Sequence, residues 1–154
     1  MGLLITKAKP NPAGKDRGSR AFTPSQQLAG EWVDIQNNGT QPLSLNDVKL
    51  YHWAYTTGTS GEWKKVMGFS GMLGSMKTVR VHSGREIPLA HMNYINREGV
   101  EHHLFTGKNY VWNNAREDKP RLWHVPSEQW IDKTSYEAYP PEGKILKRVS
   151  LKLV

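Results

Sequence analysis

The residue types that most often do chemistry in proteins are present in this chain, but their spacing does not assemble a site. The 154 residues include six histidines and no cysteine, which excludes thiolate nucleophiles, disulfides and cysteine-ligated zinc. His102 and His103 are adjacent, so on a strand they point to opposite faces and are poorly placed to hold one ion. His82 and His91 stand alone in the sequence. We therefore expect no metal site and no cofactor.

Catalytic patterns are equally incomplete. The chain has serines but no G-x-S-x-G elbow. The run SGMLGSMKT resembles a phosphate loop, yet Met76 stands where the pattern needs glycine before the lysine. Asp34, Asp118 and Asp132 are the candidate carboxylates, and acids in hairpins and turns are usually capping or solvated groups. We expect a protein that is not an enzyme.

The segments that would position these residues have the pattern of an all-β protein. No window shows a helical stripe of ten residues, whereas β-branched and aromatic runs recur between turn signals. The predicted strands are 3–8, 31–36, 41–45, 48–53, 63–66, 78–83, 102–106, 110–113, 121–124, 130–133 and 145–153. Short strands at this spacing predict an antiparallel β-sandwich rather than an α/β sheet.

Several local features follow from the same pattern. Asn38-Gly39 is typical of a two-residue type I′ turn and predicts a hairpin between residues 31–36 and 41–45. In the run TVRVHS, alternation predicts that Val79 and Val81 point inward and Arg80 and His82 outward. Residues 10–30 are rich in Pro, Gly, Ser and basic residues, which predicts a long mobile loop.

The net charge of +7 is concentrated at the two ends of the chain. Residues 1–30 hold five basic residues and one acidic residue, residues 144–154 hold four basic residues and no acid, and the body between them is nearly neutral. Basic groups attract phosphates by releasing counterions, so the candidate sites for an anionic partner are Lys7, Lys9, Lys15, Arg17, Arg20, Arg148 and Lys152. If the first and last strands lie on one side of the sandwich, these groups form one patch. The alternative is that basic ends only keep the domain soluble.

Length and hydropathy favour a single soluble domain spanning residues 1–154. The only apolar run near the start is Leu3 to Ile5, which is too short for a signal peptide or a membrane span. Composition does not indicate a compartment or an oligomeric state.

Four motifs resemble those of the lamin tail domain family. These are GEWVDIQNNGTQPLSLNDVKL at residues 30–50, YVWNNAREDKPRL at 110–122, WIDKTSYEA at 130–138 and the upstream PNPAGKD at 10–16. Their order and spacing agree with the family over roughly residues 3–138. The chain departs from the family in the segment 17–29, at Val48, where members often have tryptophan, and in a longer turn after the W-N-N motif.

The resemblance implies an immunoglobulin-like β-sandwich without catalytic residues. Lamin tail domains are known for binding DNA, chromatin components and other proteins, and similar bacterial modules are attached to exported or surface enzymes. The sequence therefore predicts a non-catalytic interaction module that contacts nucleic acid or another anionic partner through its basic ends. The alternative is a protein-contact module, in which a sheet edge or the aromatic residues Trp53, Tyr55 and Trp63 meet another protein, within a larger exported or surface protein.

Overall fold

Two facing sheets form the molecule, as seen in a computed structural model that describes residues 2–13 and 24–154. The larger sheet has the strand order β12-β11-β1-β2-β7-β8 and the smaller one the order β10-β9-β4-β5. The first contains β1 (Leu3–Lys9), β2 (Trp32–Asn37), β7 (Thr78–His82), β8 (His102–Phe105), β11 (Leu146–Val149) and β12 (Lys152–Leu153). The second contains β4 (Val48–Thr57), β5 (Ser60–Gly68), β9 (Arg121–His124) and β10 (Gln129–Lys133). The predicted all-β sandwich is confirmed.

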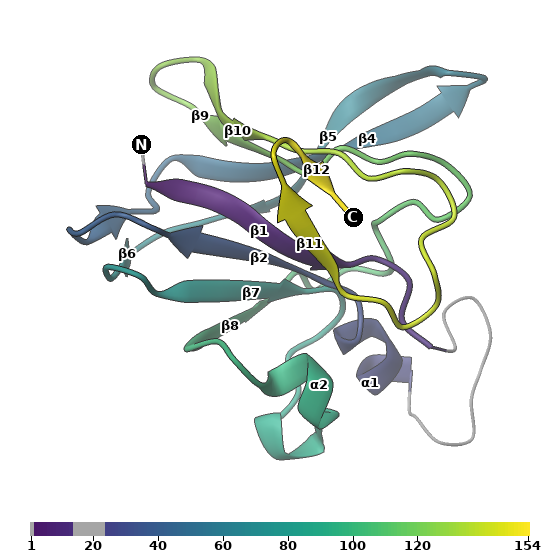
Figure 1. The fold of residues 1–154 in the computed structure, drawn as a ribbon, viewed down its shortest axis with the longest axis horizontal. Helices are drawn as coiled ribbons and strands as arrows, with labels where there is room; N and C mark the ends of the chain where they lie inside the picture. The colour runs from purple at the N-terminus through teal and green to yellow at the C-terminus, as the bar shows by residue number, and fades with distance from the viewer. Residues whose placement is uncertain (1, 14–23) are drawn as a thin grey trace.

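Five short elements complete the described fold. The strands β3 (Leu43–Ser44) and β6 (Met72–Leu73) pair with each other outside the two large sheets. The helices α1 (Pro24–Ala29) and α2 (Tyr94–Arg97), with a 3₁₀ turn at Leu89–His91, lie at one end of the larger sheet (Figure 1). The pair β7–β8 is parallel, an exception to the antiparallel arrangement that the sequence predicts.

The core lies between the two sheets and follows the alternation of the strands. Ile5, Ile35 and Val81 point inward from the larger sheet, and Leu50 and Leu122 from the smaller one, each at most 2% exposed. Burying such a side chain stabilises the fold by about 1.5–3 kcal/mol. Inward-facing positions are therefore apolar, and their period of two in the sequence predicts the strands well.

The predicted hairpin at Asn38-Gly39 is wrong. β2 pairs with β1 and β7, whereas β3 pairs with β6, and neither Asn38 nor Gly39 has the positive φ that a type I′ turn needs. The cause is the buried side chain of Asn37, whose amide donates to the carbonyls of Gln41 and Leu73 and whose oxygen accepts from the Gly39 N–H. These bonds lead the chain out of the larger sheet.

Two predicted strands also differ from the structure. Residues 110–113 are irregular because the loop is bound to buried carboxylates instead of a neighbouring strand. Residues 145–153 form a tight hairpin rather than one strand, with Ser150 at φ 56° in the turn between β11 and β12. The predicted single strand is therefore wrong, and Val149 and Leu151, near the turn, are 61% and 59% exposed.

The outer face of β2 and β7 is covered, which the sequence pattern does not predict. Arg80 and His82, expected to face solvent, are 3% and 0% exposed. The carbonyl of Ala29, the last residue of α1, contacts His82, and the carbonyl of Asn96 in α2 contacts Arg80. The helix α1 also corrects the prediction of a loop throughout residues 10–30.

Candidate functional site

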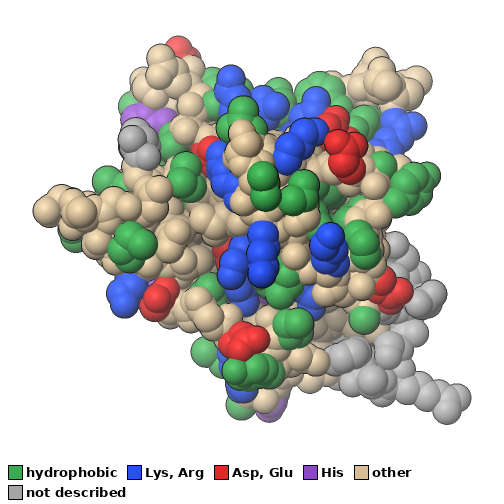
Figure 2. Space-filling model, in the orientation of Figure 1, with side chains coloured by type: hydrophobic (Ala, Val, Ile, Leu, Met, Phe, Trp, Pro, Cys, Tyr) green, Lys and Arg blue, Asp and Glu red, His purple; other side chains and the backbone are tan. Residues whose placement is uncertain are grey.

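The predicted basic residues are partly brought together. β1 and β11 are neighbours, with Lys7 opposite Lys147, so the two ends of the chain do form adjoining strands on one side of the sandwich. Figure 2 shows Lys and Arg side chains gathered over this face of the larger sheet. Lys15, Arg17 and Arg20 lie outside the residues that the structure describes.

Three of the other predicted site residues are buried or form ion pairs within the protein. Lys9 is only 5% exposed and so does not belong to an exposed basic patch. Arg148 forms a bidentate ion pair with Asp132, at 2.5 and 2.9 Å, and donates to the carbonyl of Ile5. Lys152 pairs with Glu137 at 3.2 Å. Lys7 is thus the one described member of the predicted set for which no such partner is found.

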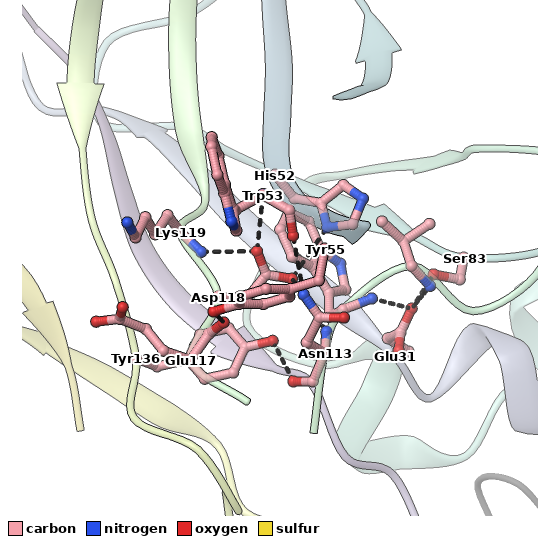
Figure 3. A network of polar contacts seen from close by, with 12 residues as sticks. Glu31, His52, Trp53, Tyr55, Ser83, Asn113, Glu117, Asp118, Lys119 and Tyr136 are labelled. Carbon is pink, nitrogen blue, oxygen red and sulfur yellow. Dashed lines mark hydrogen bonds and ion pairs between the residues drawn. The ribbon is translucent and has the colours of Figure 1, made fainter. Parts of the chain in front are cut away.

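The Asp118 carboxylate is fully buried and organises the loop that contains the W-N-N motif. It accepts hydrogen bonds from His52 Nδ1, from the backbone N–H groups of Trp53, Asn113 and Lys119, and from the Asn113 side chain, all within 3.0 Å (Figure 3). Because so many donors point at it, this carboxylate serves as a hydrogen-bond acceptor for the loop. The expectation of a capping acid is therefore met in a buried setting, not a solvated one.

Glu31 is a second fully buried carboxylate in the same region. It accepts from the Ser83 hydroxyl at 2.5 Å and from the N–H of Val111 at 2.8 Å (Figure 3). Nearby, the Tyr136 hydroxyl donates to the carbonyl of Asn113, and burial raises the pKa of this phenol. These contacts brace the 110–118 loop against both sheets.

His82 does not stand alone, contrary to its position in the sequence. Its Nε2 lies 2.8 Å from His103 Nδ1, and its Nδ1 lies 2.6 Å from the carbonyl of Ala29. Burial lowers the pKa of His82 to about 3, and the nearby charges of His103, Arg80 and Lys9 act in the same direction. The pair is therefore neutral at ordinary pH and joins β7, β8 and α1.

We expect the stability of the protein to fall as the pH drops from about 6.5 toward about 3. In this window the unfolded chain binds a proton at His82 that the folded chain does not, so the free energy of unfolding decreases by at most about 1.4 kcal/mol per pH unit. Chemical denaturation at a series of pH values measures this. His82→Gln should flatten the dependence of the unfolding free energy on pH. His91→Gln, at an exposed histidine, should leave this dependence unchanged. If the two variants gave parallel curves, His82 would not be the group responsible.

A continuous aromatic cluster covers the outer side of the smaller sheet. The ring centroids of Trp123 and Trp130 are 4.9 Å apart, those of Trp130 and Trp63 4.9 Å, and those of Trp63 and Trp53 5.1 Å. Tyr51 meets Trp130 edge to face at 5.8 Å. These side chains are half-buried and line a hollow of about 440 Å³ whose walls are Tyr51, Trp63, Trp123 and Trp130.

Basic residues are interleaved with these rings. The Arg121 guanidinium lies 4.6 Å from the Trp63 ring centre and 5.7 Å from that of Trp130. Residues opposite each other in an antiparallel pair project to the same side. The register therefore places Lys49 beside Trp123, Lys65 beside Tyr51 and Lys133 beside Arg121. We call the surface formed by Lys49, Tyr51, Trp53, Trp63, Lys65, Arg121, Trp123, Trp130 and Lys133 the aromatic-basic face.

The aromatic-basic face contains four basic side chains, those of Lys49, Lys65, Arg121 and Lys133, and no acidic one. In the part of the chain that the structure describes, no ion pair joins Lys49, Lys65, Arg121 or Lys133 to a carboxylate. The buried Nε of Arg121 has no hydrogen-bond partner among the described residues, and desolvation lowers the pKa of its guanidinium. Such a surface can stack planar rings and attract anions, and it repels the cationic ligands that aromatic cages often hold.

No protein-family model and no curated protein matches this chain. Within residues 2–13 and 24–154, no three His, Asp or Glu side chains converge as metal ligands. None of the described helices has the length and apolar character needed to cross a membrane.

Most of the aromatic-basic face is not predicted from the sequence. Of its residues, only Trp53 and Trp63 belong to the predicted protein-contact set, and Tyr55 of that set lies farther along β4, under the guanidinium of Arg116. The signal was present as alternation, because Lys49, Tyr51 and Trp53 occupy every second position of one strand. What the sequence does not show is which neighbouring strands place further aromatic residues beside them.

Proposed function

We propose that this chain is a non-catalytic binding module of lamin-tail type that takes single-stranded nucleic acid on its aromatic-basic face. The observation that carries the proposal is Arg121, whose guanidinium lies 4.6 Å from the ring centre of Trp63 and 5.7 Å from that of Trp130 and whose buried Nε has no hydrogen-bond partner among the described residues. Proteins that bind single strands combine aromatic rings, on which bases stack, with basic groups that follow the phosphates. The immunoglobulin-like sandwich implied by the family resemblance belongs to the same proposal.

The arrangement of the face supports a strand rather than a duplex. The rings of Trp123, Trp130, Trp63 and Trp53 form a row with neighbouring centres about 5 Å apart. Unstacked bases can reach such rings, whereas bases inside a duplex have their faces covered. Lys49, Lys65 and Lys133 lie around the row and are placed to meet phosphates.

The basic residues at the chain ends are less well placed to bind nucleic acid. Of the four predicted residues that the structure describes, Lys9 is buried and Arg148 and Lys152 are ion-paired. The exposed pair of Lys7 and Lys147 on the larger sheet remains as a second basic patch. It therefore serves as the natural comparison in an experiment.

Titration of the intact protein with a short oligothymidylate, followed by tryptophan fluorescence, tests the proposal. We expect tryptophan fluorescence to be quenched on binding. The affinity should fall as salt rises, and the logarithm of the association constant, plotted against the logarithm of the salt concentration, should have a slope of about −0.7 for each phosphate contacted. Trp130→Ala should cost about 1–3 kcal/mol of binding free energy, the value of one stacked base. Arg121→Gln should weaken binding and make the salt dependence shallower.

The matched control is Lys7→Gln combined with Lys147→Gln, which removes two charges from the other sheet. We expect this variant to bind like the wild type. If it loses affinity while Arg121→Gln does not, the partner binds the chain-end patch instead. Absent or salt-insensitive binding would favour the protein-contact alternative, in which Trp53, Tyr55 and Trp63 meet another protein.

A further inference from the structure

A second candidate site lies on the larger sheet, where β1 ends beside α1 and α2. A cavity of about 230 Å³ is lined there by Lys9, Pro12, Gln27, Gly30, Ile95 and Asn96, among others. The helices at this end of the sheet are seen at the bottom of Figure 1. Lys9 belongs to a different sheet from the aromatic-basic face, so the cavity is independent of the function proposed above.

Lys9 brings a positive charge into the wall of this cavity. Its ammonium donates to Asn96 Oδ1 at 2.5 Å, an oxygen that also accepts from Trp32 Nε1 at 3.1 Å. An ammonium has three protons to donate, and no described carboxylate forms an ion pair with this one. Burial and the charge of Arg80 lower the pKa of Lys9 to about 8, so the charged form is held at a cost.

Gln27 supplies a second buried donor, for which no described residue is the acceptor. Its side chain lines the same cavity and is 8% exposed, and its buried Nε2 has no hydrogen bond among the described residues. A buried amide donor left unpaired destabilises the fold, and such groups are rare in folded proteins. An acceptor inside the cavity would remove this cost.

Among the described residues, the charges around the cavity are also unbalanced. Arg80, close enough to shift the pKa of Lys9, is paired with Asp34 through two bonds of 2.7 and 2.8 Å. Lys9 and Arg80 are both buried cations, and among the described residues only Arg80 has a carboxylate partner. The walls beside the two donors include the apolar side chains of Pro12 and Ile95.

We propose that this cavity binds a small carboxylate anion, whose two oxygens accept from Lys9 Nζ and Gln27 Nε2 and whose short apolar tail lies against Pro12 and Ile95. The anion supplies both the negative charge and the acceptor that Lys9 and Gln27 do not find among the described residues. Gly30 keeps the site open, since a side chain there would come within 2.9 Å of Pro12.

Nuclear magnetic resonance titration of the isotope-labelled protein with sodium acetate and sodium butyrate tests the proposal, with sodium chloride keeping the ionic strength constant. We expect saturable shifts at the Gln27 side-chain amide, Gly30 and Asn96, with butyrate binding more tightly than acetate. Binding should weaken as the pH is raised well above 8, where Lys9 loses its proton. Shifts that do not saturate, or that spread over the exposed lysines, would overturn the site.

Two substitutions separate the donors. Lys9→Met keeps most of the length of the side chain without the charge and should weaken butyrate binding at least tenfold. Gln27→Leu should weaken it several-fold. Lys147→Met, at an exposed lysine of the same sheet, is the control and should bind like the wild type. Unchanged binding in Gln27→Leu, together with pH-independent binding by the wild type, would refute the proposal even if Lys9→Met does not fold.

Discussion

Asp118→Ala is expected to lower the free energy of unfolding by about 4 kcal/mol or more. The substitution leaves donors of His52, Trp53, Asn113 and Lys119 without their acceptor in a region where Asp118 itself is 0% exposed. Each buried donor left unpaired costs about 1–3 kcal/mol. Since small domains are stable by only about 5–15 kcal/mol, much of the stability would be lost. Chemical denaturation measures the change.

Glu137→Ala is the control for removing an acidic side chain. Its carboxylate pairs with Lys152 at 3.2 Å but its side chain is 78% exposed, so we expect a change within about 1 kcal/mol. A small effect of Asp118→Ala, similar to that of Glu137→Ala, would mean that water replaces the buried carboxylate. Trp53 lies next to Asp118, so the same variant should also disturb ligand binding at the aromatic-basic face.

Asp34→Asn is expected to cost about 3–5 kcal/mol, the usual effect of breaking a buried ion pair. Asp34 is 2% exposed and receives both bonds of the Arg80 guanidinium, which lies 3.6 Å from the ring centre of Trp32. Without the carboxylate, a charged guanidinium stays in the interior. Arg80 and Lys9 would then be two buried cations with no described acid between them.

A double-mutant cycle separates the ion pair from the packing around it. Asp34→Leu combined with Arg80→Met removes both charges, and the loss should be smaller than the sum of the two single losses by about 2 kcal/mol or more. Some loss remains because Arg80 also donates to the carbonyls of Asn96 and Glu98. Additive effects would show that the pair contributes little.

The strands were predictable because their inward positions repeat with a period of two. The same rule fails at Arg80 and His82, because α1 and α2 cover the side of the sheet that a sandwich usually leaves to solvent. The turn at Asn38-Gly39 fails for another reason. The side chain of Asn37 is bonded to residues far along the chain, and such tertiary contacts override local turn preferences.

Candidate binding residues were harder to predict than strands. Charge counts locate basic residues at the chain ends but not their partners, and Arg148 is paired with Asp132, an acid 16 positions away in the sequence. The buried environment of Lys9 depends on α1 and α2, neither of which has a clear sequence pattern. By contrast, alternation already places Lys49, Tyr51 and Trp53 on one face of a strand. Only the order of the strands, which brings the other aromatic residues beside them, could not be predicted.

The row of indoles on the smaller sheet also affects how the protein absorbs light. Trp123, Trp130, Trp63 and Trp53 have neighbouring ring centres 4.9–5.1 Å apart and steeply inclined planes. Electronic transitions of rings this close couple as excitons and add bands to the circular dichroism spectrum that the backbone does not produce. Secondary-structure content fitted to that spectrum would be distorted, whereas the infrared amide band would report the sheets directly.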